Sequence, residues 1–435
     1  MRPREIFLCF LTAVATLTLS VCGCQESKKI DCQIVGHSMA PSFKSEHSTA
    51  SCDRCEFEFA CDVRVGEDGK FPALICGNCG CQIAQELTPQ PADQVKLEPG
   101  AFVKRWDVVA FQRGDRVLVK RVIGLPGELV DFSEGNLLIG GRVAKKPAEL
   151  WEGIGTCVFD SNPAGADKNS DQLIERIMPR SKEAWDFTNA GIIHDSTSVP
   201  NDGKAVPEFD FLDYRHRKCY KHSDDPKALA GVDDSNPFNQ SLRRIPRRVD
   251  ELDVRIEVAF AEQGTIRIQR QTTKGTISAA VEIRDDQTIA LELTRRSGGD
   301  IKTLMNAGIR VADRDVEISV VNYDDLIHLL IDGMEYVDPI RFESIENPER
   351  FEVDVSEPFV SIGVSRETSI TIKRVSIWRD WYLYQKAPKP SVKLPLDMGD
   401  RGYYVVGDNL PVSEDSRHFG IVHDIIGVVQ PVDGK

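Results

Sequence analysis

Three separated stretches of the chain carry side chains that could together perform nucleophilic chemistry. A serine, Ser38, lies in the short segment Gly-His-Ser-Met-Ala-Pro at positions 36–41. A lysine, Lys120, lies far downstream in an apolar run, and a polar segment at 407–417 lies near the end of the sequence. Because a free serine hydroxyl is a poor nucleophile, a neighbouring group must accept its proton. These stretches predict a serine nucleophile whose base is an amine, with the third stretch holding that base in place.

Lys120 has the sequence surroundings of a lysine that has lost part of its hydration. It is flanked by the apolar run 117–123, and on a strand it would share a face with Leu118 and Val122. Loss of water lowers the pKa of an amine from about 10.4 toward the roughly 7 to 8 that suits a general base. A shift of about three pKa units costs on the order of 4 kcal/mol, so only a well-built pocket would hold it. The alternative is an ordinary strand lysine whose amine reaches solvent.

Cysteines are concentrated in the first part of the chain, since ten of the twelve precede residue 82. Two Cys-x2-Cys pairs, Cys52 with Cys55 and Cys76 with Cys79, have nearly the spacing of a four-cysteine zinc ribbon. Four thiolates around a metal would fold a small unit that has little core of its own. The pattern predicts a structural zinc ion, whereas no cofactor is expected for catalysis.

A pair of disulfides is the alternative for these four cysteines, because an exported protein could form them. Cys61 and Cys81 leave the ligand set open, since they could pair with each other or replace a ligand. The metal content of the purified protein would distinguish zinc from disulfides.

Length and charge limit the class of protein. At 435 residues the chain is longer than one hydrophobic core usually spans, so two or more domains are expected. The formal net charge of -14 argues against a nucleic-acid partner, which would need a basic face. The short basic cluster at 243–248 is interpreted as a solvated loop.

The N-terminus carries a membrane signal. After two arginines, residues 6–21 contain no charge, a length between a secretory apolar region and a full spanning helix. We expect a signal or anchor segment at 1–27, contact with the membrane lipid surface, and a catalytic domain outside the cytoplasm. A lipoprotein signal is the third alternative, because Cys22 or Cys24 could be lipidated.

The remaining pattern predicts a mainly β protein. Two strands are expected at 108–111 and 117–123, two more at 128–132 and 137–139, and a closing strand at 421–429. Residues 160–250 are rich in polar residues and predict loops. Between 251 and 385 many short runs alternate with period two, which indicates an antiparallel β-sandwich. These runs are 254–260, 265–269, 277–283, 289–293, 316–320, 326–331 and 369–377.

The predicted organisation is a β catalytic core interrupted twice, with one N-terminal apolar helix. The core would be built from parts that are distant in the sequence, separated by a cysteine-rich insert and a sandwich insertion. The expected boundaries are 1–27 for the signal or anchor, 28–50 for the first core part with the nucleophile, 51–90 for the zinc-ribbon-like insert, 91–150 for the second core part with the base, 151–390 for the loop-rich segment and sandwich, and 391–435 for the third core part.

Four segments resemble the bacterial type I signal peptidases of peptidase family S26, and they occur in the order found in that family. The third and fourth are long enough to make chance agreement improbable. The segments are Gly36-x-Ser38-Met39-x-Pro41, Trp106-Asp-Val-Val-x-Phe111, Lys120-Arg-Val-Ile-Gly-Leu-Pro-Gly-Glu128 and Gly407-Asp408-Asn409-x3-Ser413-x-Asp415-Ser416-Arg417-x2-Gly420. With the strands around them they cover about half of the chain.

The resemblance implies a Ser/Lys dyad that cleaves signal peptides from exported preproteins. Ser38 would be the nucleophile and Lys120 the general base, and the Ser38 backbone N–H would contribute to the oxyanion hole. Met39 would help to shape the pockets for the small residues of the signal peptide. Gly36 stands where many members place a serine that assists the oxyanion.

The C-terminal segment would support the dyad, according to the same resemblance. Ser413 would hydrogen-bond the lysine amine, and Asp415 and Arg417 would form an ion pair that braces the segment. Asp408 and Asn409 belong to the same supporting set. The cysteine-rich stretch departs from the family, which carries membrane-facing strands in that interval.

The sandwich admits a second reading of the whole chain. Its last run, 369–382, looks like the closing strand of concanavalin-like or laminin-G-like sandwiches. Such a domain could bind carbohydrate or a protein, although a fold does not by itself give a function. The alternative function is a non-catalytic or weakly catalytic cell-surface binding protein on a signal-peptidase-like core.

Overall fold

The computed structural model is mainly β, which confirms the predicted fold class. It describes residues 30–63, 73–83, 87–163, 175–196, 208–220, 223, 225, 228–273, 275–286, 288–297, 300–310, 313–341, 357–385, 393–400 and 402–432. The predicted N-terminal apolar helix lies outside these residues. Within them, no helix is both long and apolar enough to cross a membrane.

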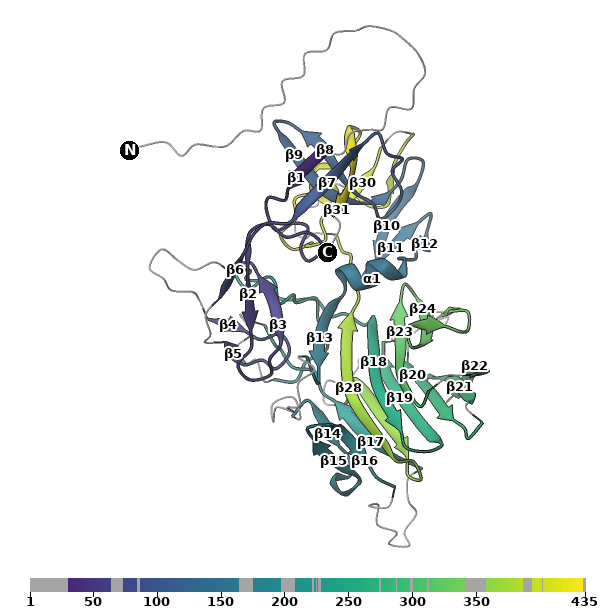
Figure 1. Ribbon diagram of the computed structural model, residues 1–435. Helices are drawn as coiled ribbons and strands as arrows, with labels where there is room; N and C mark the ends of the chain where they lie inside the picture. Colours follow the sequence, from purple (N-terminus) through teal and green to yellow (C-terminus); the bar gives the residue numbers. More distant parts are fainter. Residues whose placement is uncertain are drawn as a thin grey trace.

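A six-stranded antiparallel sheet forms the part of the molecule that carries Ser38 and Lys120, at the top of Figure 1. Its strands come from three distant parts of the chain, and the final strand of the sequence lies inside the sheet. In spatial order they are β1 (Ile30–Gln33), β7 (Gln94–Pro99), β31 (Ile425–Pro431), β8 (Val108–Arg113), β9 (Arg116–Gly124) and β30 (Tyr404–Val406).

The hairpin expected at 108–123 is present as β8 and β9. The two strands pair from Val108 opposite Arg121 to Arg113 opposite Arg116. The turn contains Gly114 at φ 57, a left-handed conformation that glycine adopts without a steric penalty. The hairpin brings Lys120 opposite Val109, on the strand next to the edge strand β30.

A smaller four-stranded sheet adjoins this hairpin. Its order is β12 (Arg142–Val143), β11 (Asn136–Ile139), β10 (Leu129–Ser133) and β29 (Leu396–Asp397), and helix α1 (Ala148–Ile154) follows it. One apolar cluster joins this sheet to the six-stranded sheet and to the helix, through Ile123, Val130, Leu150 and Tyr404. The short helix α3 (Ser416–Phe419) closes the C-terminal polar segment.

Two larger antiparallel sheets form the sandwich at the bottom of Figure 1. The first contains β15 (Trp185–Thr188), β16 (Gly191–His194), β28 (Ile370–Arg379), β18 (Leu252–Phe260), β23 (Asp315–Tyr323), β24 (Leu326–Ile331) and β25 (Met334–Glu335), with β13 (Thr156–Asp160) on β28 and β26 (Ile340–Arg341) on β24. The second contains β14 (Ile177–Pro179), β17 (Phe209–Tyr214), β27 (Val360–Ser365), β19 (Gly264–Thr272), β20 (Gly275–Ile283), β21 (Thr288–Ser297) and β22 (Asp300–Arg310).

The alternation that predicted the sandwich is the alternation that builds its core. On β18 the side chains of Val254, Ile256 and Val258 are fully buried, and Ile266 on β19 and Ile277 on β20 belong to the same cluster. The residues between them point to the outer faces. Period-two patterning therefore marks strands with one buried face.

Several strands were not predicted. Residues 160–250, expected to be loops, contain β14 to β17 and a short 3-10 helix, η1 (Lys182–Ala184), and strands β22 and β27 were also missed. Two aspartates, Asp210 and Asp213, interrupt the apolar pattern of β17. They can be buried because Asp210 contacts His194 and Asp213 pairs with Arg180. The expected closing strand at 421–429 begins only at Ile425.

The cysteine-rich segment forms two small sheets beside the sandwich, at the left of Figure 1. They are β3 (Glu58–Cys61), β2 (His47–Ser51) and β6 (Thr88–Gln90), and the pair β4 (Leu74–Ile75) and β5 (Gln82–Ile83). Leu74 and the four cysteines share one apolar cluster with Phe159 of β13. Arg176, fully buried in the sandwich, donates to the backbone oxygen of Asn78. This unit is therefore packed against the sandwich.

Candidate active site

Ser38 lies in a tight turn that follows β1 and is supported from below. Gly36 has φ 83, and a residue with a Cβ would be strained there. Ala40 N–H donates to the carbonyl oxygen of His37, and Phe43 N–H donates to that of Met39. Met39 is only 2% exposed and packs in an apolar cluster beneath the turn. The turn thus leaves Ser38 half-buried at the surface.

Lys120 points from β9 to this serine. Its Nζ atom lies 2.7 Å from the Ser38 Oγ atom, and it also donates to the Val119 carbonyl oxygen at 2.9 Å. The lysine itself is 3% exposed. The structure therefore brings together the two residues that the sequence singled out, although they are far apart in the chain.

The protonation of Lys120 depends on two opposing effects. Burial is the larger effect and lowers the pKa of Lys120 to about 8, whereas the carboxylates of Asp415, Asp408 and Glu414 act in the opposite direction. At pH 7 an amine with this pKa is neutral in about a tenth of the molecules, against far less than a hundredth for a free lysine. A neutral amine can accept the proton of a serine hydroxyl.

Ser413 is buried close to the dyad without the predicted contact. A Cβ atom at Gly407 would collide with both the Ser413 Oγ atom and the Ser38 carbonyl oxygen, which shows how closely the three residues pack. Among the described residues, however, no hydrogen bond joins the Ser413 Oγ atom to the Lys120 amine, and the Ser413 hydroxyl acts instead on Asp415, whose pKa it helps to lower. The expected hydrogen bond to Lys120 is therefore not formed in this structure.

Asp415 and Arg417 form the ion pair expected from the resemblance. Arg417 Nε and Nη2 donate to the two Asp415 carboxylate oxygens at 2.8 and 2.9 Å, and both side chains are fully buried. Burial raises the pKa of Asp415, but the side chains of His418 and Arg417 outweigh it and hold the pKa well below its usual range. Arg417 also donates to the Leu410 carbonyl oxygen at 2.8 Å, so the pair ties the C-terminal segment together.

Asp408 and Asn409 hold the turn that contains Ser38 and the strand that contains Lys120. Asp408 accepts two hydrogen bonds from Arg121, at 2.7 and 2.6 Å. Asn409 donates its backbone N–H to the Ser38 carbonyl oxygen and its side-chain amide to the His37 carbonyl oxygen, both at 3.0 Å. Ser38 is thus attached directly to the segment that follows β30.

Three contacts of this site were not predicted from the sequence. Arg121 was recognised as part of a motif, but its pairing with Asp408 was not foreseen. Trp381 donates to the Asp408 carbonyl oxygen at 3.0 Å, and Asn239 bonds to Asn409 at 2.8 Å. Trp381 and Asn239 come from the region assigned to the insertion, and neither belongs to the four segments that resemble the peptidase family.

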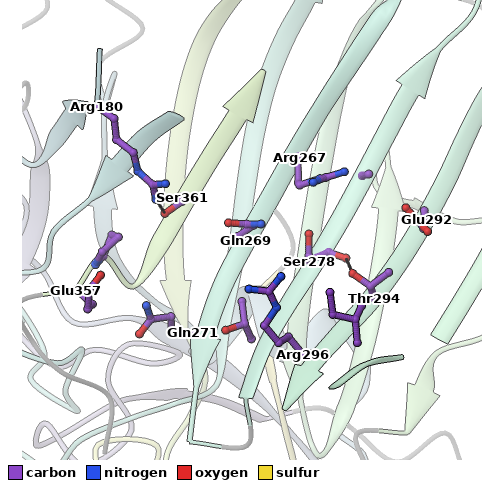
Figure 2. A pocket seen from close by; sticks show the side chains of 14 residues that line it. Arg180, Arg267, Gln269, Gln271, Ser278, Glu292, Thr294, Arg296, Glu357 and Ser361 are labelled. Carbon is purple, nitrogen blue, oxygen red and sulfur yellow. Dashed lines mark hydrogen bonds between the residues drawn. The ribbon is translucent and has the colours of Figure 1, made fainter. Parts of the chain in front are cut away.

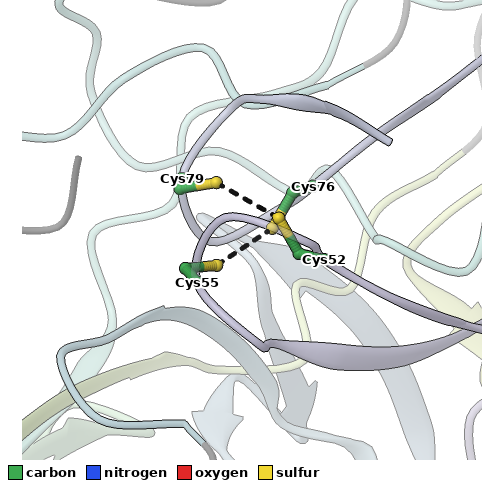
Figure 3. Close-up of side chains that lie close together, drawn as sticks. All are labelled: Cys52, Cys55, Cys76 and Cys79. Atoms are coloured by element: carbon green, nitrogen blue, oxygen red, sulfur yellow. Dashed lines mark hydrogen bonds between the residues drawn. The ribbon is translucent and has the colours of Figure 1, made fainter. Parts of the chain in front are cut away.

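The two predicted Cys-x2-Cys pairs meet in a single cluster, shown in Figure 3. The sulfur of Cys52 lies 3.6 Å from that of Cys79, and the sulfur of Cys55 lies 3.6 Å from that of Cys76. All four sulfurs lie within 4.8 Å of one another, and all four residues are buried. These separations exclude disulfide bonds between the two close pairs, because bonded sulfurs lie about 2.05 Å apart.

The cluster fits a tetrahedral metal. Zinc–sulfur bonds of about 2.3 Å place the sulfurs of a tetrahedral site about 3.8 Å apart. Each pair lies on a similar turn, in which Glu56 N–H donates to the Cys52 carbonyl oxygen and Gly80 N–H to that of Cys76. Four buried cysteines could therefore hold a metal ion here.

A polar hollow of about 390 Å³ lies on the outer face of the second sandwich sheet, the one that contains β19 to β21 (Figure 2). Gln269 and Gln271 from β19, Ser278 from β20 and Thr294 from β21 line its floor. These residues occupy the strand positions opposite to the buried ones, so their side chains face outward. Arg180, which pairs with Asp213, stands at one side of the hollow.

Comparison with known families supports the resemblance for the first part of the chain. Residues 5–152 match the family described as signal peptidase, peptidase S26. This range contains Ser38, Lys120 and both cysteine pairs, and it ends before the sandwich. The match supports assignment of this part of the chain to the S26 peptidases.

A particular relative agrees with that class. Signal peptidase I V of Bacillus subtilis (strain 168) is 41% identical over 46 residues, which are 10% of this chain. The matching stretch spans only 27% of that relative.

Solved structures match this chain only weakly. A carbohydrate binding module, CBM66 from Bacillus subtilis, matches with 7% identity and a TM-score of 0.24, over 47% of this chain and 92% of that one. The Crh5 transglycosylase in complex with NAG matches with 10% identity and a TM-score of 0.31, over 60% of this chain and 91% of that one. At these TM-scores the similarities assign neither a function nor a ligand to this chain.

Proposed function

We propose that this chain is a membrane-associated serine endopeptidase that removes signal peptides from exported preproteins. The observation that carries the proposal is the contact of 2.7 Å between the Lys120 amine and the Ser38 hydroxyl, with the lysine buried and its pKa lowered to about 8. The family match over residues 5–152 supports the same class of enzyme.

The first chemical step is transfer of the Ser38 proton to neutral Lys120. The Ser38 Oγ atom attacks the scissile carbonyl carbon, and the carbonyl oxygen becomes an oxyanion. The Ser38 backbone N–H would donate to this oxyanion, and donors of this kind are worth several kcal/mol in other enzymes. Gly36 offers no side-chain donor, so the chain must stabilise the oxyanion mainly through its backbone.

The second step returns the proton to the leaving group. The Lys120 ammonium protonates the nitrogen of the departing peptide, which leaves an ester between Ser38 and the signal peptide. Lys120, neutral again, then takes a proton from water as the water oxygen attacks the ester carbonyl carbon. The Lys120 ammonium returns that proton to the departing Ser38 Oγ atom, which regenerates the serine hydroxyl and releases the signal peptide with a free carboxyl group. Asp408 and Asn409 hold the two reacting residues in register, and the ion pair of Asp415 and Arg417 fixes the segment behind them.

The cysteine cluster would supply structure to this enzyme. A zinc ion held by Cys52, Cys55, Cys76 and Cys79 would fold the insert and take no part in the chemistry. The predicted anchor at 1–27 would place Ser38 close to the membrane surface on the side outside the cytoplasm, where preproteins emerge.

Cleavage of a preprotein by the purified full chain tests the proposal. Ser38→Ala and Lys120→Met should each lower kcat by at least about 10³-fold, as removal of a nucleophile or base does in other serine proteases. For the wild type, kcat/KM should rise with pH as Lys120 loses its proton near pH 8. If the wild type and Ser38→Ala process the preprotein equally poorly, the peptidase assignment is wrong.

A second candidate function is a cell-surface binding protein on a weakly catalytic or inactive core. The polar hollow on the sandwich favours it, because amide and hydroxyl side chains there could bind the hydroxyl groups of a carbohydrate or a polar protein surface. Glycan-array binding that is lost in Gln269→Ala, together with absence of cleavage, would favour this function over the first.

A further inference from the structure

One loop of the sandwich region, Asn236–Ser241, lies between the cysteine-rich unit and the turn at residues 36–43 that contains Ser38. We call the turn at 36–43 the nucleophile turn. The loop contacts both, although it is distant from each in the sequence. Two of its side chains, Phe238 and Gln240, are each only 3% exposed. We call this segment the strap.

The strap is attached to the cysteine-rich unit by backbone and side-chain bonds. The Gln240 side chain accepts from the Ile75 N–H and donates to the Ile75 carbonyl oxygen, both at 3.1 Å. Ile75 immediately precedes Cys76. Asp62 N–H donates to the Phe238 carbonyl oxygen at 2.8 Å, and Ser241 N–H donates to the Asp62 carboxylate at 3.0 Å. These bonds fix the strap to both halves of the unit.

Close packing reinforces this attachment at the second cysteine pair. Gly77 lies between Cys76 and Cys79, and a Cβ atom there would meet the Pro237 side chain at 2.7 Å. The glycine is therefore needed for the close approach of the Pro237 side chain. A change in the shape of this turn would therefore displace the Pro237 side chain.

On its other side the strap reaches the nucleophile turn. The side-chain amides of Asn239 and Asn409 donate to each other's oxygen, each at 2.8 Å. Asn409 is 2% exposed and holds the carbonyl oxygens of both His37 and Ser38. The Phe238 ring also meets the His37 ring, with centroids 5.3 Å apart. Ser38 is thus one residue removed from the strap.

We propose that the strap positions Ser38, with Asn239 acting through Asn409, and that the metal-folded cysteine cluster holds the strap in place. The catalytic consequence rests on the proposed peptidase function, whereas the structural coupling does not. The strap has no regular secondary structure of its own, so its position depends on these two attachments. The cluster then controls a reactive residue without touching substrate.

The positioning role predicts a specific kinetic effect. Asn239→Ala removes both bonds to Asn409, and kcat for preprotein cleavage should fall about tenfold or more, because small misplacements of a reacting group are costly. KM should stay within about twofold, since no substrate contact is lost. Asn239→Asp keeps the acceptor for Asn409 and should recover part of the rate. Asn189→Ala, the same change in an exposed turn of the sandwich, is the matched control and should have no effect.

Two results would overturn this role. One is an unchanged kcat in Asn239→Ala, and the other is an equal loss in Asn239→Ala and Asn189→Ala. A fall in kcat that Asn239→Asp does not relieve would likewise show that the amide pair is not the cause.

Hydrogen–deuterium exchange tests the coupling without reference to activity. Removal of metal from the full chain by EDTA should speed exchange at the cluster, in the strap and in peptides covering 36–43 and 407–413. Exchange in the middle of β18 and β19 should not change. Gln240→Ala should speed exchange in the strap and the nucleophile turn even with metal present, because it cuts the bonds to Ile75.

The outcomes separate this inference from the proposed function. Faster exchange confined to the cluster would refute the coupling, and absence of any response to EDTA would refute the role of a metal. If the wild type cleaves no preprotein but exchange spreads from the cluster to the nucleophile turn, the peptidase assignment fails and the coupling stands.

Discussion

Two lysines, Lys120 and Lys146, are buried to nearly the same degree but have opposite electrostatic surroundings. They are 3% and 4% exposed. Lys120 donates to a serine hydroxyl and a backbone carbonyl oxygen, whereas Lys146 contacts the carboxylates of Asp324 and Asp380. Burial lowers the pKa of Lys120 to about 8. Burial also acts to lower the pKa of Lys146, but the carboxylates of Asp380, Asp324 and Glu251 outweigh it and raise that pKa.

The difference shows that burial by itself does not lower the pKa of a lysine, because nearby carboxylates can outweigh it. Carboxylates also lie near Lys120, but each of the two buried ones is engaged by an arginine. Asp408 receives two hydrogen bonds from Arg121, and Asp415 receives two from Arg417. The arginines keep these acids in place and offset their charge, so that among the described residues Lys120 has no direct counterion. Lys146, in contrast, joins the small sheet to the sandwich as a permanent cation.

The largest effect on stability is expected when Lys146 loses its charge. Lys146→Met leaves Asp324 and Asp380 buried without their cation, and the free energy of unfolding should fall by about 3–5 kcal/mol. Urea denaturation measures the loss. Lys104→Met, the same change on an exposed loop, should cost little. An unchanged stability in Lys146→Met would show that Lys146 is not needed to compensate the buried charges of Asp324 and Asp380.

The opposite sign is expected at Lys120. Its folded-state pKa is lower than the unfolded value of about 10.4, so the unfolded chain binds more protons between about pH 8 and pH 10. Stability from this group therefore rises with pH across that window and is lowest below it. Lys120→Met removes the penalty and should raise the free energy of unfolding by about 1–3 kcal/mol at pH 7 while abolishing cleavage.

The measurement is a pair of denaturation curves for Lys120→Met and wild type. The gain in Lys120→Met should shrink as pH approaches 10. A gain that is the same at pH 7 and pH 10 would mean that the charge of Lys120 is not its origin.

The smallest effect is expected from an exposed acid near the dyad. Glu414 acts to raise the pKa of Lys120, and its side chain is 58% exposed beside Arg116. Glu414→Gln should shift the rising limb of the pH–activity profile to lower pH by a few tenths of a unit, and less at high salt. Glu149→Gln, an exposed acid on α1, is the control. A shift to higher pH would show that the charge of Glu414 does not raise the pKa of Lys120.

The sequence predicted those parts of the fold in which one face of a strand is buried. The alternating runs at 254–260 and 277–283 became β18 and β20, and the hairpin carrying Lys120 was placed within a few residues. Strand β27 was missed because five of its six residues are buried, which erases the alternation. Strand β17 was missed because buried aspartates, each with a partner from elsewhere in the sandwich, interrupt its apolar pattern.

The site divides in a similar way. Ser38, Lys120 and the segment 407–417 could be found from motifs, because their residue types are fixed by chemistry. The cysteine pairs could be found from their spacing. Asn239 could not be found, because its role depends on where the insertion folds back against Asn409. The absence of a hydrogen bond between Ser413 and Lys120 could not be predicted either, since it depends on the orientation of one hydroxyl.

The place of β31 in the six-stranded sheet affects the order in which the protein can be completed. Strand β31 lies between β7 and β8, so the six-stranded sheet has a gap until residues 425–431 have joined it. Pairing over so long a stretch of chain is slow compared with the local hairpins of the sandwich. The sandwich and the cysteine-rich unit can therefore form while Ser38 and Lys120 are still unlinked. In the proposed peptidase, this order would delay assembly of the active site until the sandwich has folded.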